Sequence, residues 1–209
     1  MKEFFITLFL LISMENAIDK SKMLIIYFSR TGNTDKFANY IKKNTNITSY
    51  RIIPSNPYPE NYDTMLEIAK QEQSNNSRPE IQNPLSDISQ YDTILLGYPI
   101  WYSHIPNIVI SQLEKLNFKG KTIYPFNTHG GSGVGSSISD IKEYTKEANV
   151  KDGYPIKGGE IDKKENDIIE WLDDNFDLEY NGTSGFDYSI NKGSTYIMKC
   201  IYLLIYFLL

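Results

Sequence analysis

A short polar loop, Ser29–Thr34 (SRTGNT), holds the residues best suited to ligand binding. It follows the apolar run Leu24–Phe28 and precedes a helical pattern that begins at Asp35. Because a helix N-terminus carries free N–H groups and a partial positive charge, hydroxyl and amide side chains beside it can bind a phosphate dianion. Capping of the helix is the competing interpretation, but the loop has more polar and small residues than a cap requires. The GxxxxGK[ST] pattern is missing, which argues against a nucleoside triphosphate.

Two later loops carry residues suited to contact with a flat ring. The loop 98–106 (YPIWYSHIP) places Trp101 and Tyr102 just past the end of an apolar run. These aromatic side chains either plug the edge of the domain or form a stacking platform, and the phosphate loop favours the platform. In the loop 127–135 (NTHGGSGVG), glycines would bring backbone N–H groups against ring carbonyls, while His129 either contacts the ligand or braces the turn. Together the loops predict a nucleotide-like ligand.

The elements that must position these loops alternate between two periods. Short apolar runs typical of buried strands are each followed by apolar residues at helical spacing. The expected strands are Leu24–Phe28, Tyr50–Ile53, Thr93–Leu96, Thr122–Phe126 and a short fifth strand within Val150–Ile156. This alternation predicts an α/β fold, a parallel five-stranded sheet with helices on both faces. Ligands of such sheets bind beyond the carboxyl ends of the strands, so the three loops are expected at one edge.

Composition excludes several classes of protein. The chain has 209 residues, of which 41% are hydrophobic and 22% charged, so it is neither disordered throughout nor a polytopic membrane protein. A net charge of −5 argues against a nucleic-acid partner, since such proteins usually present a basic face. Cys200 is the single cysteine, which excludes an intrachain disulfide and a cysteine-ligated cluster. With two histidines in the chain, a His-rich site is excluded too, and we expect no metal.

We expect three parts in the chain: an apolar N-terminal segment (1–21), one ligand-binding domain (22–176), and a linker with an apolar tail (177–209). The first segment is interpreted as a signal or uncleaved anchor, an interfacial helix, or the product of a start codon placed too early. The tail is interpreted as a hydrophobic anchor or as an artefact of translation or assembly. Both runs are shorter than the roughly 20 residues of a spanning helix. We expect a cytoplasmic protein, with membrane contact or export as the alternative if the N-terminal segment is retained.

The segment Tyr27–Thr34 resembles the phosphate loop of flavodoxins. The segments Leu96–Tyr102 and Asn127–Gly133 resemble the two flavin-facing loops of bacterial flavodoxin-like proteins, and the match runs from about Lys22 to Asp174. The resemblance implies a three-layer, doubly wound sheet with strand order 2-1-3-4-5. It also implies flavin mononucleotide (FMN) as the cofactor.

Carried over by residue, the resemblance assigns the FMN phosphate to the first loop, with Arg30 at its rim, through Ser29, Thr31, Gly32, Asn33 and Thr34. It assigns one side of the isoalloxazine ring to Pro99, Ile100, Trp101 and Tyr102, and the other to Thr128, His129, Gly130, Gly131 and Gly133. No catalytic residue is expected, because the flavin carries the chemistry. The sequence departs from the pattern at Ser103, where many relatives have a glycine after the aromatic pair.

The resemblance implies an electron carrier of low potential, whose partners are redox proteins or small electron acceptors. Apolar stacking and the negative net charge both disfavour the anionic reduced flavin, which lowers the potential. An FMN-dependent NAD(P)H:quinone-type oxidoreductase is the alternative, but the sequence has no nicotinamide-binding motif. A binding module that has lost the flavin is the third interpretation, and the intact phosphate loop argues against it.

Overall fold

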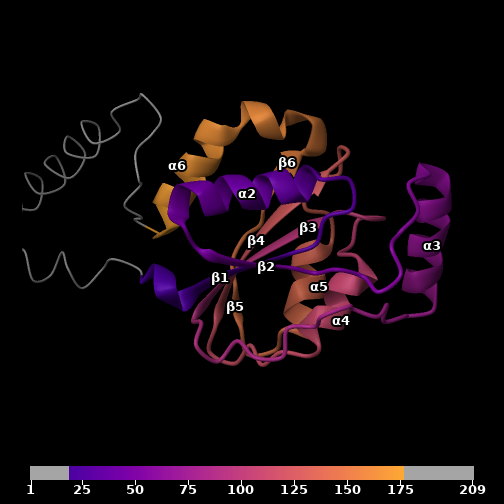
Figure 1. Ribbon diagram of the computed structural model, residues 1–209, viewed down its shortest axis with the longest axis horizontal. Helices are drawn as coiled ribbons and strands as arrows, with labels where there is room; N and C mark the ends of the chain where they lie inside the picture. The colour runs from indigo at the N-terminus through magenta and orange to yellow at the C-terminus, as the bar shows by residue number, and fades with distance from the viewer. Residues whose placement is uncertain (1–18, 177–209) are drawn as a thin grey trace, which may run out of the picture. The chain divides into compact units, whose positions relative to one another are not determined.

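The computed structural model describes residues 19–176 (Figure 1). Residues 1–18 of the predicted N-terminal segment 1–21 and the whole predicted segment 177–209 lie outside the described residues. In chain order the elements are η1 (Lys20–Lys22), β1 (Met23–Tyr27), α2 (Asn33–Thr45), β2 (Thr48–Arg51), α3 (Tyr62–Ser74), β3 (Thr93–Pro99), α4 (Asn107–Leu113), β4 (Thr122–His129), α5 (Ser137–Tyr144), β5 (Asn149–Val150), β6 (Tyr154–Lys157), η2 (Gly158–Lys163) and α6 (Glu165–Phe176). In this described part, no helix is both long enough and apolar enough to cross a membrane.

The strands form one parallel sheet in the order β2-β1-β3-β4-β5, with β6 also paired to β4. This confirms the predicted α/β fold and strand order. The expected fifth strand consists of two short pieces, because β5 pairs with the first two residues of β4 and β6 with the last four. The order reverses between β1 and β3, which is where ligands bind in open sheets of this kind.

Pro125 lies in the middle of β4, and not near its end as a strand over Thr122–Phe126 would place it. The strand extends to His129, so Pro125 is the partner of Leu96 on β3. On the other side of β4, pairing with β5 ends at Ile123 and pairing with β6 begins at Phe126. The proline, which lacks a backbone N–H, therefore falls in the gap between the two short strands.

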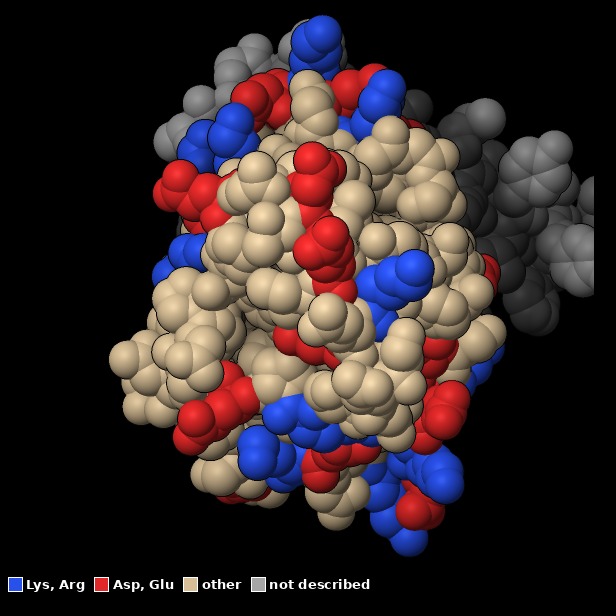
Figure 2. All heavy atoms as spheres, turned by 90° about the vertical axis from the view of Figure 1, so that its right-hand side faces the viewer, with Lys and Arg blue, Asp and Glu red and all other residues tan. Residues whose placement is uncertain are grey.

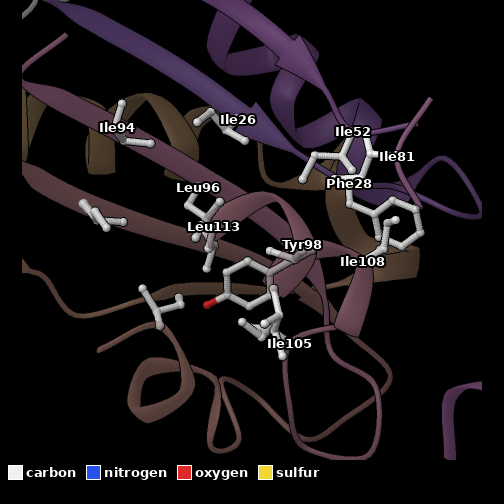
Figure 3. Packing of buried hydrophobic residues seen from close by; sticks show 14 of the residues in the cluster. Ile26, Phe28, Ile52, Ile81, Ile94, Leu96, Tyr98, Ile105, Ile108 and Leu113 are labelled. Carbon is white, nitrogen blue, oxygen red and sulfur yellow. The ribbon is translucent and has the colours of Figure 1, made fainter. Parts of the chain in front are cut away.

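Helices cover both faces of the sheet, with α2 and α6 on one side and α4 and α5 on the other (Figure 1). All five residues of β1 are buried, because alternate side chains pack against alternate faces. Towards α2, Phe37 contacts Phe126 with ring centroids 4.7 Å apart. Towards α4, the ring of Tyr98 lies beside Ile105 and Leu113 (Figure 3). The two cores fix the sheet, so its carboxyl edge is a rigid base for the loops.

Candidate functional site

Loops from the carboxyl ends of β1, β3, β4 and β6 surround a cavity of about 350 Å³. Small-molecule sites typically span about 300–1,000 Å³. The cavity is lined by Ser29, Arg30, Thr31, Asn33, Thr34, Tyr62, Met65, Leu66, Pro99, Ile100, Trp101, Tyr102, Thr128, His129, Gly130, Lys157, Gly158 and Gly159. Twelve of the fifteen residues predicted from the sequence are in this lining, and the three outside it are Gly32, Gly131 and Gly133. The structure therefore brings the three predicted loops to one place.

The phosphate-type loop leaves the N-terminus of α2 without a side-chain cap. The N-cap residue is Gly32, whose φ of +92° lies in the left-handed region that glycine adopts without strain. Its N–H donates to Ser29 Oγ at 3.2 Å, which folds the loop back on itself. Because no side chain in the described part of the chain caps α2, the simple capping interpretation does not account for the loop. The hydroxyls of Thr34 and Thr128 are 2.8 Å apart, so this loop and the end of β4 are directly joined.

A polar network behind the loop holds its backbone. Tyr27 donates from its hydroxyl to Asp35 Oδ1 at 2.8 Å, and Arg51 lies 3.3 Å from the same carboxylate oxygen. Arg51 also donates to the carbonyl oxygen of Ser29 at 3.3 Å. Burial, and then the hydrogen bond to Asp35, raise the pKa of Tyr27 to about 12. Tyr27 therefore stays a neutral donor, and the start of the loop is fixed to β2 and α2.

Arg30 connects the loop to the segment that leads into α3. Its Nε and Nη2 donate to the carbonyl oxygen of Pro59 at 3.1 and 2.6 Å, and Nη2 also donates to that of Glu60. Arg30 lines the cavity, but its guanidinium is directed to these carbonyls. The residue therefore positions the start of α3, which contributes Tyr62 to the cavity wall.

The two aromatic residues after β3 occupy different environments. The side chain of Trp101 is only 7% exposed and meets Phe28 and Tyr58 edge to face, with ring centroids 5.6 and 4.9 Å apart. Tyr102 is 45% exposed at the rim, and Tyr62 from α3 is 63% exposed. Trp101 thus closes the edge of the core while also lining the cavity, and the two tyrosines border its opening.

Trp101 and His104 close a tight turn whose two central residues have positive φ. Tyr102 has φ 48° and Ser103 φ 69°, and the backbones of Trp101 and His104 exchange hydrogen bonds of 3.0 and 2.9 Å. Side chains disfavour this left-handed conformation, so the surrounding structure must hold it. Asp140 on α5 lies 3.0 Å from His104 Nδ1.

The neighbouring backbone holds the same turn. Asp140 also accepts from the Ile105 N–H at 3.1 Å. The Ser136 N–H donates to the carbonyl oxygen of Ser103 at 2.6 Å. The turn that carries Tyr102 is therefore fixed from α5 and from the loop before it.

The last residue of β4, His129, contributes an imidazole with an unpartnered buried nitrogen. His129 Nδ1 is buried and has no hydrogen-bond partner among residues 19–176. Burial lowers the pKa of His129, and the nearby Lys157 charge lowers it further against the opposing effect of Glu160. His129 is therefore neutral at pH 7, and one nitrogen is available to a ligand. Asn127 donates to the carbonyl oxygen of Gly133 at 3.0 Å and so holds the glycine-rich loop, whose Gly131 and Gly133 are not part of the cavity lining.

Two groups of lining residues were missed by the sequence reasoning. Tyr62, Met65 and Leu66 come from α3, and the sequence reasoning assigned none of them to the site. The segment Lys157–Gly159 begins at the last residue of β6. The signal for it was present, because a Lys-Gly-Gly segment directly after the last strand also lies at the carboxyl edge of a parallel sheet.

The residues present fit a flavin mononucleotide. One side of the cavity offers hydroxyls, amides and the uncapped end of α2, which suit a phosphate. The other side offers apolar and aromatic side chains, which suit a flat ring, and His129 supplies a polar atom that lacks a partner in the described chain. No cluster of three or more His, Cys, Asp or Glu side chains that could hold a metal ion occurs within residues 19–176.

The sequence model of the flavodoxin family matches residues 22–175. Among solved structures, a putative flavoprotein from Bacteroides eggerthii is 30% identical with a TM-score of 0.61, over 76% of this chain and 99% of that one. One from Bacteroides uniformis is 28% identical with a TM-score of 0.64, over 73% and 97%. A Lactobacillus acidophilus flavoprotein, solved in complex with FMN, is 25% identical with a TM-score of 0.54, over 68% and 97%. A search of curated proteins found no match.

Proposed function

Because this chain belongs to the flavodoxin family, we propose that it binds FMN in the cavity at the carboxyl edge of the sheet and carries electrons at low potential. One observation carries the proposal: the loops after β1, β3 and β4 meet around a single cavity with a phosphate-type end and an aromatic wall. The bound FMN would supply one- and two-electron transfer. The protein's task is then to hold the cofactor, exclude water from the ring and leave one edge accessible.

The phosphate is assigned to the loop Ser29–Thr34. The free N–H groups of α2 point into this loop, and their partial positive charge favours an anion. Thr31 and Asn33 line the cavity beside them and can donate further hydrogen bonds. Supporting this assignment, the described residues that line the cavity include no Asp or Glu.

The ring is assigned to the apolar wall formed by residues 99–102. Pro99 and Ile100 lie at the end of β3, and Ile100 donates its N–H to the Thr128 carbonyl, so this wall is fixed to β4. An apolar wall disfavours a gain of negative charge in the site. Reduction that leaves the flavin anionic is therefore harder than in water, and the potential of the bound cofactor falls. Tyr62 and Tyr102, both exposed at the opening, leave one side open to an electron-transfer partner.

The surface beside the opening supports docking to a partner with basic groups. Glu60, Asp63 and Glu67 are exposed along the start of α3, next to the cavity-lining Tyr62. Figure 2 shows the face that carries α3, where acidic side chains lie among a broad area of uncharged ones, with basic side chains nearby. Attraction between such a rim and a basic partner mainly accelerates encounter and weakens as salt is added.

The proposal is tested by adding FMN to the purified chain and then NADPH alone, without oxygen. A carrier binds FMN, and NADPH alone does not reduce the bound FMN until a reductase is added. Its midpoint potential, measured by redox titration, lies below that of free FMN. Rapid reduction of the bound FMN by NADPH alone would indicate an NAD(P)H-dependent oxidoreductase and not an electron carrier. A chain that does not bind added FMN would indicate a binding module that has lost the flavin.

A further inference from the structure

Two cations line the cavity of this acidic chain, and they differ in what they contact. The guanidinium of Arg30 donates to the carbonyls of Pro59 and Glu60. Lys157, at the end of β6, is exposed and forms no ion pair or side-chain hydrogen bond with any residue from 19 to 176. Of the two, Lys157 has a charge that is free to meet a ligand.

The position of Lys157 places it beside the end of α2. In the parallel ladder it is the register partner of His129 on β4. The residue before His129, Thr128, contacts the Thr34 hydroxyl in the first turn of α2. The residue after Lys157 is Gly158, where an added Cβ would lie only 2.6 Å from Nδ2 of Asn33. Contacts on both sides of Lys157 therefore lead to the helix N-terminus to which the phosphate is assigned.

We propose that Lys157 pairs with the phosphate of the bound flavin and makes the site selective for FMN over riboflavin. This inference rests on the proposed binding of FMN in the cavity. An ammonium group beside a phosphate dianion forms a charge-assisted contact, which a neutral donor does not match. Riboflavin has the same ring and ribityl chain but no phosphate, so it cannot form this contact. The last strand of the sheet thereby supplies a cation to a phosphate loop whose own Arg30 is engaged elsewhere.

The test compares FMN with riboflavin in the full chain. Each flavin is titrated into the apo protein, and quenching of its fluorescence gives the Kd. Lys157→Met removes the charge and keeps an apolar stem, while Lys157→Arg keeps the charge. Lys151→Met is the matched control, because the Lys151 N–H donates to the carbonyl of Ile123 near the amino end of β4, away from the cavity.

We expect Lys157→Met to weaken FMN binding about tenfold, or about 1.4 kcal/mol, and to change riboflavin binding less than about twofold. Lys157→Arg restores FMN binding, and Lys151→Met leaves both flavins unchanged. Added salt weakens FMN binding more in the wild-type chain than in Lys157→Met, because the variant lacks the charge pair between Lys157 and the phosphate that salt screens.

Two results would overturn the role of Lys157 alone: unchanged FMN affinity in Lys157→Met, or an equal loss for both flavins. A wild-type chain that binds neither flavin would overturn the proposed function, and this inference with it. Thermal unfolding of the apo variants separates these results from misfolding. We expect the melting temperature of each Lys157 variant to equal that of the wild-type chain, because Lys157 is exposed and unpaired in the described chain.

Discussion

Replacing Ser103 by glycine should stabilise the protein, against the usual effect of such a change. Ser103 has φ 69°, and its backbone carbonyl accepts from the Ser136 N–H, a contact that glycine retains. Holding a side chain in the left-handed region costs about 1–2 kcal/mol, whereas the greater freedom of glycine in the unfolded chain costs about 0.5–1 kcal/mol. The net gain in the free energy of unfolding for Ser103→Gly is therefore about 0–1.5 kcal/mol, centred on about 0.8 kcal/mol.

Ser139→Gly is the matched control, because Ser139 is exposed within α5, where glycine is a poor helix former. That change should lower the free energy of unfolding by about 0.5 kcal/mol. Chemical denaturation of the apo variants, followed by circular dichroism, measures the free energy of unfolding of each variant. The melting temperatures of the two variants should differ by about 2–4 °C for each kcal/mol between them. A loss in Ser103→Gly as large as in Ser139→Gly would refute the strain assigned to this turn.

The remaining predictions concern the contacts between the loops. Thr34→Val or Thr128→Val alone leaves one buried hydroxyl unpaired and should cost about 1–3 kcal/mol of unfolding free energy. The double variant should lose less than the sum of the two, and a denaturant double-mutant cycle that shows simple additivity would contradict the pairing. Burial holds the pKa of His129 below 6.5, so the folded apo protein binds fewer protons than the unfolded chain and loses stability as pH falls below 6.5. His129→Asn should remove this part of the acid sensitivity in unfolding measured across that range, and an unchanged pH dependence would count against a half-buried imidazole that the fold keeps neutral.

The arrangement of the sheet was predictable because its signals are local and repeated. The run Leu24–Phe28 is apolar at every position, as a strand covered on both faces requires. Parallel strands then bring their carboxyl ends to one edge, so the loops at residues 29, 99 and 128 had to converge. The division of the last strand into β5 and β6 was not predictable, because it depends on which part of β4 each piece meets.

Within the site, the convergence of the loops was easier to predict than the contacts of their side chains. The polar character of Ser29–Thr34 indicated a phosphate, and the structure leaves α2 without a side-chain cap there. Arg30 donates to the carbonyl of Pro59, twenty-nine positions away in the chain, and the local sequence does not specify such a contact. The departure at Ser103 was visible in the sequence, but its left-handed conformation follows from contacts with Ser136 and from the pairing of His104 with Asp140.

The central claim is that the loop Ser29–Thr34 binds the phosphate of a flavin held in this cavity. Calorimetric titration of FMN into the apo wild-type chain and into a Thr31→Leu, Asn33→Leu variant tests it most directly. We expect one FMN per wild-type chain and a loss of affinity of about a hundredfold in the variant, which corresponds to about 2.7 kcal/mol. Equal affinity in a variant that remains folded, or no binding by the wild-type chain, would contradict the account.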